Sequence, residues 1–184
     1  MSKLFKYAGI AASLVLVAFG IGAIYMGVDG RDMVRSNLAR EQIVGTPDST
    51  IPNQLVDTGK EAEAFANVMR KHTLEATGGQ TYAQMGRYLD ASGKPTNDEN
   101  KAAKDAKTGQ PVENGLRNLW VTETALTTAL NTSYFAESVA TFAIAMGAAL
   151  LLVGTGFLVF IVRLLLPAGR REASPAKAAV PAAS

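Results

Sequence analysis

Two stretches of this chain contain no Asp, Glu, Lys, Arg or His: YAGIAASLVLVAFGIGAIYMGV (Tyr7–Val28) and SVATFAIAMGAALLLVGTGFLVFIV (Ser138–Val162). They hold 22 and 25 residues. As helices that rise 1.5 Å per residue they would span roughly 33 and 37 Å, which exceeds the hydrocarbon core of about 30 Å. The sequence therefore predicts an integral membrane protein that crosses the bilayer twice.

The remaining residues divide the chain into a small number of parts. We expect a fold of the all-α class, with two transmembrane helices extended into a small extracytoplasmic helical bundle. The expected parts are a cytoplasmic N-terminal tail 1–6, transmembrane helix 7–28, extracytoplasmic helical domain 29–136, transmembrane helix 137–162 and disordered cytoplasmic tail 163–184. The chain has no cysteine, so the outer domain has to be held together without disulfides.

Charge is distributed unevenly along the chain and predicts its orientation. The tails carry six basic residues and one acid, whereas the segment between the spans carries 12 basic and 15 acidic residues. Positive residues near span ends are retained in the cytoplasm, so we expect both termini inside and the middle domain outside a plasma (inner) membrane. Arg31, Arg35 and Arg40 follow the first span closely and weaken this argument, although Asp29 and Asp32 lie among them.

The first apolar stretch has an alternative interpretation. Lys3 and Lys6 precede it, and Ala18, Phe19 and Gly20 form an acceptable cleavage site for a secretory signal peptide. The stretch is longer than the usual signal-peptide core of about 7 to 15 residues, which favours a permanent span. The sequence is compatible with both a permanent span and a cleaved signal peptide.

Helical periodicity continues outside the spans. The first helix should extend to about Val44, and the capping-box pattern Thr58/Glu61 should open a helix that ends before Gly78 and Gly79. A short helix is expected over 81–89, and one continuous helix from Gly115 to Leu166. The segment 91–114 has Val112 as its only large apolar residue, so we expect a mobile loop.

The residues offer little catalytic or cofactor chemistry. His72 is the only histidine and shares a helical stripe with Phe65 and Met69, so a packed or half-exposed histidine is favoured over a metal ligand. The acid pairs Glu61/Glu63 and Asp98/Glu99 lie in polar sequence that is typical of solvated surface. We therefore predict no enzymatic activity, no catalytic or metal-binding residue, no cofactor and no nucleic-acid partner.

Two other groups of residues are candidates for packing or binding. Small residues four apart could allow close approach of membrane helices, either within one chain or in a dimer; they are Gly9 with Ser13, Ala18 with Gly22, Ala23 with Gly27 and Ala143 with Gly147. A possible interaction or ligand groove in the outer domain is formed by Phe65, Met69, His72, Tyr82, Trp120 and Tyr134.

At TLEATGGQTYA (Thr73–Ala83) and NLWVTETALTTALNTSYFAE (Asn118–Glu137) the chain resembles a family of uncharacterised small two-span membrane proteins from actinobacteria. Members often carry the label of aromatic ring-opening dioxygenase. Extradiol chemistry needs iron held by two histidines and a carboxylate, and this chain has a single histidine. The resemblance therefore implies a topology and no activity.

Two hypotheses about function follow. The first is a non-enzymatic envelope protein, an accessory or scaffold subunit that presents the outer helical domain to a membrane or envelope partner or to a second copy of itself. The second is a ligand-sensing or small-molecule-binding membrane module that uses the groove around His72.

Overall fold

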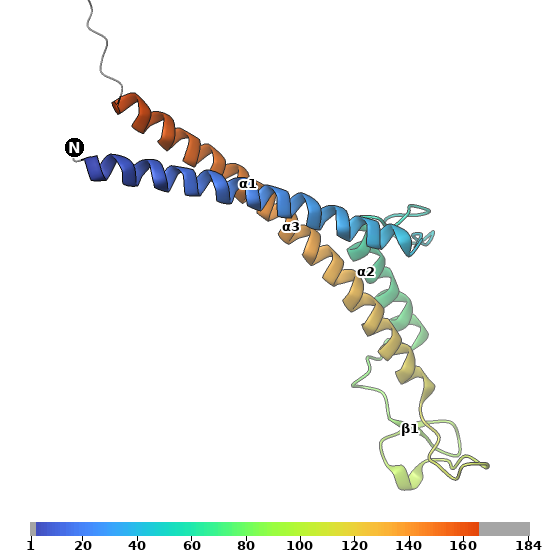
Figure 1. Ribbon diagram of the computed structural model, residues 1–184. Helices are drawn as coiled ribbons and strands as arrows, with labels where there is room; N and C mark the ends of the chain where they lie inside the picture. Colours follow the sequence, from blue (N-terminus) through green and yellow to red (C-terminus); the bar gives the residue numbers. More distant parts are fainter. Residues whose placement is uncertain (1–2, 166–184) are drawn as a thin grey trace, which may run out of the picture.

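The computed structural model describes residues 3–165 and is mostly helical. Its elements are the helices α1 (Lys3–Arg40), α2 (Gly59–Ala76) and α3 (Gly115–Leu165), the strands β1 (Tyr88–Leu89) and β2 (Pro95–Thr96), and the 3₁₀ turn η1 (Glu99–Lys101). Figure 1 shows an elongated molecule in which α1 and α2 lie along different parts of α3 and the strands lie beyond its first turn. With 51 residues, α3 alone is about 77 Å long.

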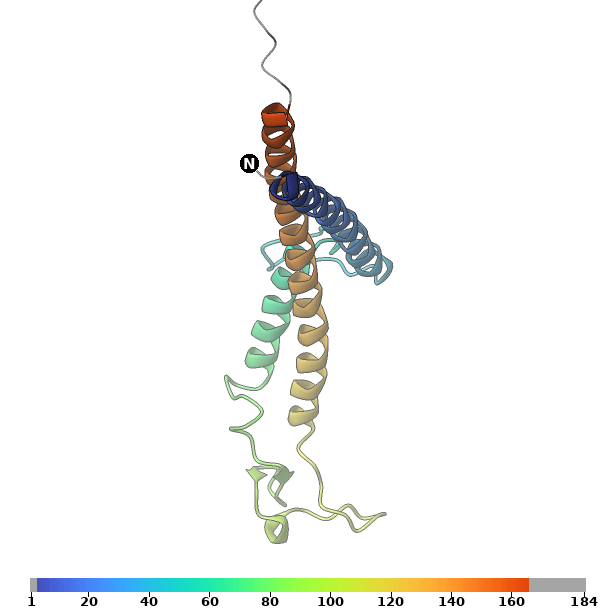
Figure 2. The same ribbon diagram turned by 60° about the vertical axis from the view of Figure 1, so that its left-hand side comes forward.

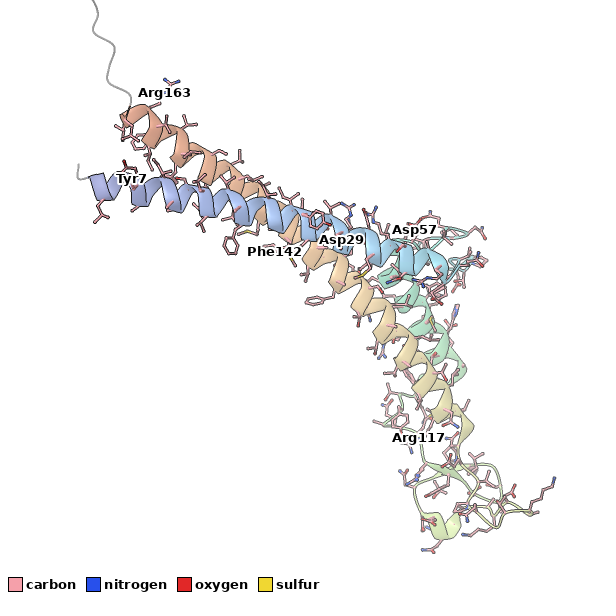
Figure 3. The ribbon with its side chains drawn as sticks, viewed as in Figure 1. Tyr7, Asp29, Asp57, Arg117, Phe142 and Arg163 are labelled. Atoms are coloured by element: carbon pink, nitrogen blue, oxygen red, sulfur yellow. The ribbon has the colours of Figure 1, made fainter. Side chains whose placement is uncertain are left out.

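Helices α1 and α3 form an antiparallel pair. Figure 3 shows Tyr7 and Arg163 at one end of this pair and Arg117 at the opposite end of the molecule. Small residues line the seam between the two helices and recur every seven positions. The buried ones are Ser13, Gly20 and Gly27 on α1 and Ala140, Gly147 and Gly154 on α3. A period of seven keeps one face of each helix turned toward its partner over a long distance.

The seam brings the two backbones into direct contact. A Cβ atom at Gly20 would lie 2.8 Å from the carbonyl oxygen of Gly147, and one at Gly147 would lie 2.7 Å from the carbonyl oxygen of Gly20. A Cβ atom at Gly27 would similarly lie 2.7 Å from the carbonyl oxygen of Ala140. Larger residues at these positions would force the helices apart, so the glycines set the interhelical distance.

Outside the seam, the charge-free stretches of both helices expose mainly apolar side chains. Each has a window long and apolar enough to cross a membrane, and only 11% of each window is buried within the molecule. Exposed side chains include Phe19 and Leu152, at 69% and 74%. A core helix of a soluble protein would be mostly buried, whereas the apolar faces of these two helices are largely uncovered by residues 3–165.

Beyond the charge-free stretches, α2 packs against α3 and the end of α1. Thr58 caps α2: its hydroxyl accepts a hydrogen bond from the Glu61 amide, and the Glu61 carboxylate accepts one from the Thr58 amide at 2.9 Å, so the predicted capping box is confirmed. A small core forms where the three helices meet. Its buried members are Leu38, Val56, Ala62, Ala66 and Leu130. This core joins the first helix to the part of α3 outside the spans.

The connector between α1 and α2 is folded back on itself. Val44 and Leu55 form an antiparallel bridge, and the Val56 amide donates to the Ile43 carbonyl at 2.8 Å. Helix α1 ends at Arg40, four residues before the predicted end at Val44, because Val44 pairs with Leu55 instead. The connector is therefore part of the three-helix junction.

A small module, residues 80–114, lies at the far end of α3 (Figure 2). The short helix expected over 81–89 is wrong: this segment forms turns and then strand β1, in which Tyr88 pairs with Thr96 of β2. Tyr88 also bridges Glu113, and this pairing fixes the backbone as a strand even though the side-chain spacing suits a helix.

Segment 91–114 contains more regular structure than its composition suggests. It forms β2, η1 and bridges from Asp90 to Ala102 and from Lys104 to Pro111. Backbone hydrogen bonds and aspartate-capped turns hold it, so its order comes from polar groups rather than apolar burial. Its mobility stays a prediction.

The single helix expected from Gly115 to Leu166 is confirmed as far as Leu165. Residues 163–165 belong to α3, and the expectation for 166–184 lies outside the described residues, as does that for residues 1 and 2.

Candidate functional site

Glu137 joins all three helices at the point where α3 leaves its charge-free stretch. Its Oε1 atom accepts hydrogen bonds from Nε of Arg35 at 2.7 Å and Nε of Arg31 at 3.3 Å, both from α1. Its Oε2 atom accepts a hydrogen bond from the backbone amide of Gly59, the first residue of α2. The Glu137 side chain is 12% exposed. We call this arrangement of Glu137, Arg31, Arg35 and Gly59 the carboxylate clasp.

The clasp explains why α2 begins where it does. The first amides of a helix have no partner within the helix, and the partial positive charge there favours an anion. Glu137 supplies that anion from α3, while Thr58 and Glu61 satisfy neighbouring amides. Gly59 is needed at this contact because a Cβ atom would lie 2.9 Å from the Glu137 carboxylate and from the Tyr134 Cα atom.

A pocket of about 500 Å³ lies beside the clasp. Three basic side chains line it, Arg31, Arg35 and Lys60, together with the single acid Glu137. Its remaining lining residues carry hydroxyl groups: Thr58, Tyr134, Ser138 and Thr141. We call this hollow the basic pocket. Its walls carry more positive than negative charge, so it is suited to an anion.

Two further acids, Asp57 and Glu61, lie close to the basic pocket, and the charge of Arg35 acts on Asp57. The Glu61 carboxylate accepts hydrogen bonds from the amides of Asp57, at 3.0 Å, and Thr58. Burial, followed by the neighbouring Glu61 carboxylate, raises the pKa of Asp57. Neither acid lines the pocket.

A second hollow, of about 570 Å³, lies between the end of α1, α2 and the middle of α3. We call it the apolar groove. Its walls are mainly apolar, from Leu38, Ile43, Phe65, Met69, Leu126, Ala129 and Leu130. Asn37, Glu41 and Ser133 supply the polar lining groups. A volume and composition of this kind are typical of sites that bind an apolar side chain or small molecule.

A third hollow, of about 260 Å³, lies where the distal module meets α3. The Arg117 guanidinium stacks on the Tyr82 ring at 4.0 Å, and the Asn114 side-chain amide donates to the Gly86 carbonyl at 3.0 Å. The buried Nε atom of Arg117 has no hydrogen-bond partner among the described residues. These contacts attach the module to the helix.

The six residues of the predicted groove lie in different places. Phe65 and Met69 line the apolar groove, Tyr82 lines the distal hollow, and Tyr134 lines the basic pocket. Trp120 is 3% exposed and donates from Nε1 to the Gln80 carbonyl at 3.0 Å. The structure therefore brings only Phe65 and Met69 of this set together in one hollow.

His72 lies outside all three hollows. It is half exposed, and its Nε2 atom is 2.9 Å from an Asp48 carboxylate oxygen that also accepts from Lys71 at 2.8 Å. Hydrogen bonds from Lys71, His72 and Thr46 hold the pKa of Asp48 well below its usual range. These contacts attach the connector to α2.

The small residues proposed for helix packing also divide into two groups. Gly9, Ser13, Gly27 and Gly147 lie on the seam, and Ala23 and Ala143 are partly buried near it. Ala18 and Gly22 are exposed, and a Cβ atom at Gly22 would meet nothing within 4 Å. The spacing of four thus includes seam residues, but the buried seam itself follows a spacing of seven.

Within residues 3–165 no group of three or more His, Asp and Glu side chains is placed to hold a metal ion. No family model, no curated protein and no solved structure matches this chain. The class that the structure defines is a mostly helical protein with two helices long and apolar enough to cross a membrane.

The clasp was absent from the sequence-based candidates. In the sequence Glu137 is the first residue of the expected transmembrane helix 137–162, and Arg31 and Arg35 are charges that weaken the predicted orientation. The sequence does place opposite charges beside these stretches: Arg31 and Arg35 follow the first, and Glu137 precedes the second. If the two helices pack antiparallel, the end of the first stretch lies beside the start of the second. Pairing them required the register of α1 against α3.

Proposed function

We propose that this protein is an integral membrane protein whose two spans carry a helical arm on the outer side of the plasma membrane, with both termini in the cytoplasm. In this proposal it is a non-enzymatic accessory or scaffold subunit that presents the arm to an envelope partner or to a second copy of itself. We also propose that the chain is related to the small two-span actinobacterial membrane proteins that it resembles.

The observation that carries the proposal is the continuity of α3. One helix of 51 residues contains both the apolar window and the segment on which α2 and the distal module rest. The carboxylate clasp and the three-helix core then fix α2 at the junction. An arm built in this way holds its binding surfaces at a fixed place relative to the membrane.

Membrane insertion is supported by the outward-facing apolar surface of α1 and α3. The serine and threonine hydroxyls on the spans donate to backbone carbonyls four residues earlier, as with Ser13 to Gly9 at 2.9 Å and Thr155 to Leu151 at 2.6 Å. Such back-bonding removes the cost of placing a hydroxyl in lipid.

The proposed orientation is supported by the contacts of the arginines that follow the first span. Arg31 and Arg35 pair with Glu137, and Arg40 donates a hydrogen bond to Asn37. Glu137 therefore offsets part of the positive charge of Arg31 and Arg35, whereas the tails keep a net positive charge. Reporter fusions at Lys101 and Lys177 test the orientation, and we expect periplasm-active reporters at Lys101 alone.

The apolar groove is the proposed contact for a partner's apolar side chains. A photo-crosslinking amino acid at Met69 should give one discrete crosslinked product in cells. Asn67, which is exposed and absent from the groove lining, is the matched control and should give none. Equal crosslinking at both positions, or none at Met69 in correctly inserted protein, would contradict a presentation role.

A second candidate function is binding of a small apolar molecule in the same groove, which its volume of about 570 Å³ would accommodate. A thermal-shift screen of envelope metabolites on the detergent-solubilised protein distinguishes binding of a small molecule from presentation to a partner. A ligand whose effect is abolished by Leu126→Arg, with Val121→Arg as an exposed control on the same helix, would favour sensing over presentation.

A further inference from the structure

We propose that the basic pocket binds the phosphate group of an anionic membrane lipid in the leaflet from which α1 and α3 emerge. The site consists of Arg31, Arg35 and Lys60. This inference rests on the membrane insertion proposed above.

The first argument is that Arg31, Arg35 and Lys60 together carry more positive charge than Glu137 balances. Arg31 and Arg35 both contact Glu137 through Nε alone, so a single carboxylate is shared between two guanidinium groups and the Gly59 amide. The terminal nitrogens of both guanidinium groups make no hydrogen bond within the described residues, and Lys60 forms no ion pair there. Those terminal nitrogens present the planar donor pattern that matches phosphate oxygens.

The second argument is depth. Arg31 is three residues past Val28, the last residue of the first charge-free stretch, which corresponds to about 4.5 Å along the helix. The polar headgroup layer occupies roughly 5 to 7 Å on each side of the hydrocarbon core. Figure 3 shows Asp29 on α1 between Tyr7, at one end of the molecule, and Asp57, near the start of α2. Arg31 therefore lies in the layer that contains lipid phosphates, and Arg35 and Lys60 line the same pocket.

The third argument is the direction in which the pocket extends. Ser138 and Thr141 line it from within the second charge-free stretch, so the pocket reaches from the charged layer toward the apolar faces of the spans. A lipid can place its phosphate against the cations while its acyl chains stay beside α3. A volume of about 500 Å³ leaves room for a headgroup beyond the phosphate itself.

The test is lipid retention by the purified full chain in an uncharged detergent, counted by native mass spectrometry. The probes are phosphatidylglycerol, phosphatidylcholine and inorganic phosphate. We expect at least tenfold preferential retention of phosphatidylglycerol over phosphatidylcholine. The preference should fall to near unity in Arg31→Gln/Lys60→Gln and remain in Arg163→Gln, which removes a cation at the opposite end of the spans.

Because Arg31 also belongs to the clasp, Lys60→Gln alone is the second variant. Lys60 is exposed and is not one of the residues that form the clasp. This variant should therefore keep its helix content, while its preference for phosphatidylglycerol falls several-fold. Helix content by circular dichroism and carbonate extraction of membranes are measured in parallel. Protein that washes off in carbonate contradicts the proposed membrane insertion as well.

Protein that stays in the membrane, yet shows no preference for phosphatidylglycerol or keeps it in both variants, overturns the lipid site alone. A different result would be binding of inorganic phosphate that weakens in Lys60→Gln, with no preference among the lipids. That result would mean that the pocket binds free phosphate, and it would overturn the proposal of a lipid ligand.

Discussion

Arg35 of α1 and Glu137 of α3 are joined by a 2.7 Å hydrogen bond although 102 residues separate them in the chain. The same carboxylate receives the first amide of α2, so one side chain fixes the relative positions of the three helices. The clasp therefore adds a polar link between the three helices to the apolar core that they share.

Replacing Glu137 by alanine should destabilise the junction. The substitution leaves two partly buried guanidinium groups and a helix N-terminal amide without their acceptor, at a cost of about 2 kcal/mol. Thermal unfolding of the detergent-solubilised protein, followed by circular dichroism, measures the effect. Glu137→Gln retains one acceptor oxygen and should lose less. Glu75→Ala, at an exposed helix position, is the control and should change stability by no more than about 0.5 kcal/mol.

Replacing Gly20 by leucine should separate the spans, because its Cβ atom alone would already lie 2.8 Å from the Gly147 carbonyl oxygen. Gly22→Leu, two residues away on the outward face, meets nothing within 4 Å and should be tolerated. Unfolding of both variants in detergent gives the comparison. Equal loss of stability in the two would show that the seam is formed by other residues.

A disulfide should form between cysteines placed at Gly30 and Ala140. A Cβ atom at Gly30 would lie 3.9 Å from the Cβ atom of Ala140, close to the usual separation in disulfides. The chain has no cysteine of its own, so no other pairing can compete within it. Non-reducing electrophoresis of a variant with a protease site in the outer domain detects the bond.

The same pair reports orientation. Spontaneous oxidation in cells is expected if residue 30 faces the outer, oxidising side, whereas a cytoplasmic location would keep the thiols reduced until an oxidant is added. Cysteines at Gly22 and Ala140 serve as the control, and they should stay reduced under both conditions because Gly22 faces away from α3.

Stability should decline in acid through Asp48. Lys71 and His72 hold the pKa of this carboxyl below its ordinary value of 3.8, so the unfolded chain takes up the proton first as the pH falls. The contribution is complete above about pH 5 and is lost progressively below pH 3.8. Thermal midpoints measured across this range should converge for wild type and Asp48→Asn at low pH. Asp32→Asn, which forms no ion pair among the described residues, should parallel wild type throughout.

Some of the structure could be predicted from local sequence because local physics is sufficient for it. The lengths of the two apolar stretches, the Thr58/Glu61 capping box and the breakers at Gly78 and Gly79 act within a few residues. The continuous helix from Gly115 also needed only the absence of a breaker. In contrast, the segment 81–89, expected to be a helix, forms turns and the short strand β1, because Tyr88 pairs with residues 96 and 113.

By itself the sequence determined that this protein is helical and that two of its helices are long and apolar enough to cross a membrane, because charge, length and periodicity are properties of contiguous residues. Tertiary structure was needed to show that Glu137 pairs with Arg31 and Arg35, that Gly20 rather than Gly22 faces Gly147, and that Trp120, Tyr134 and His72 lie in separate places. Those relationships depend on the register between helices, which is set by how closely two backbones can approach.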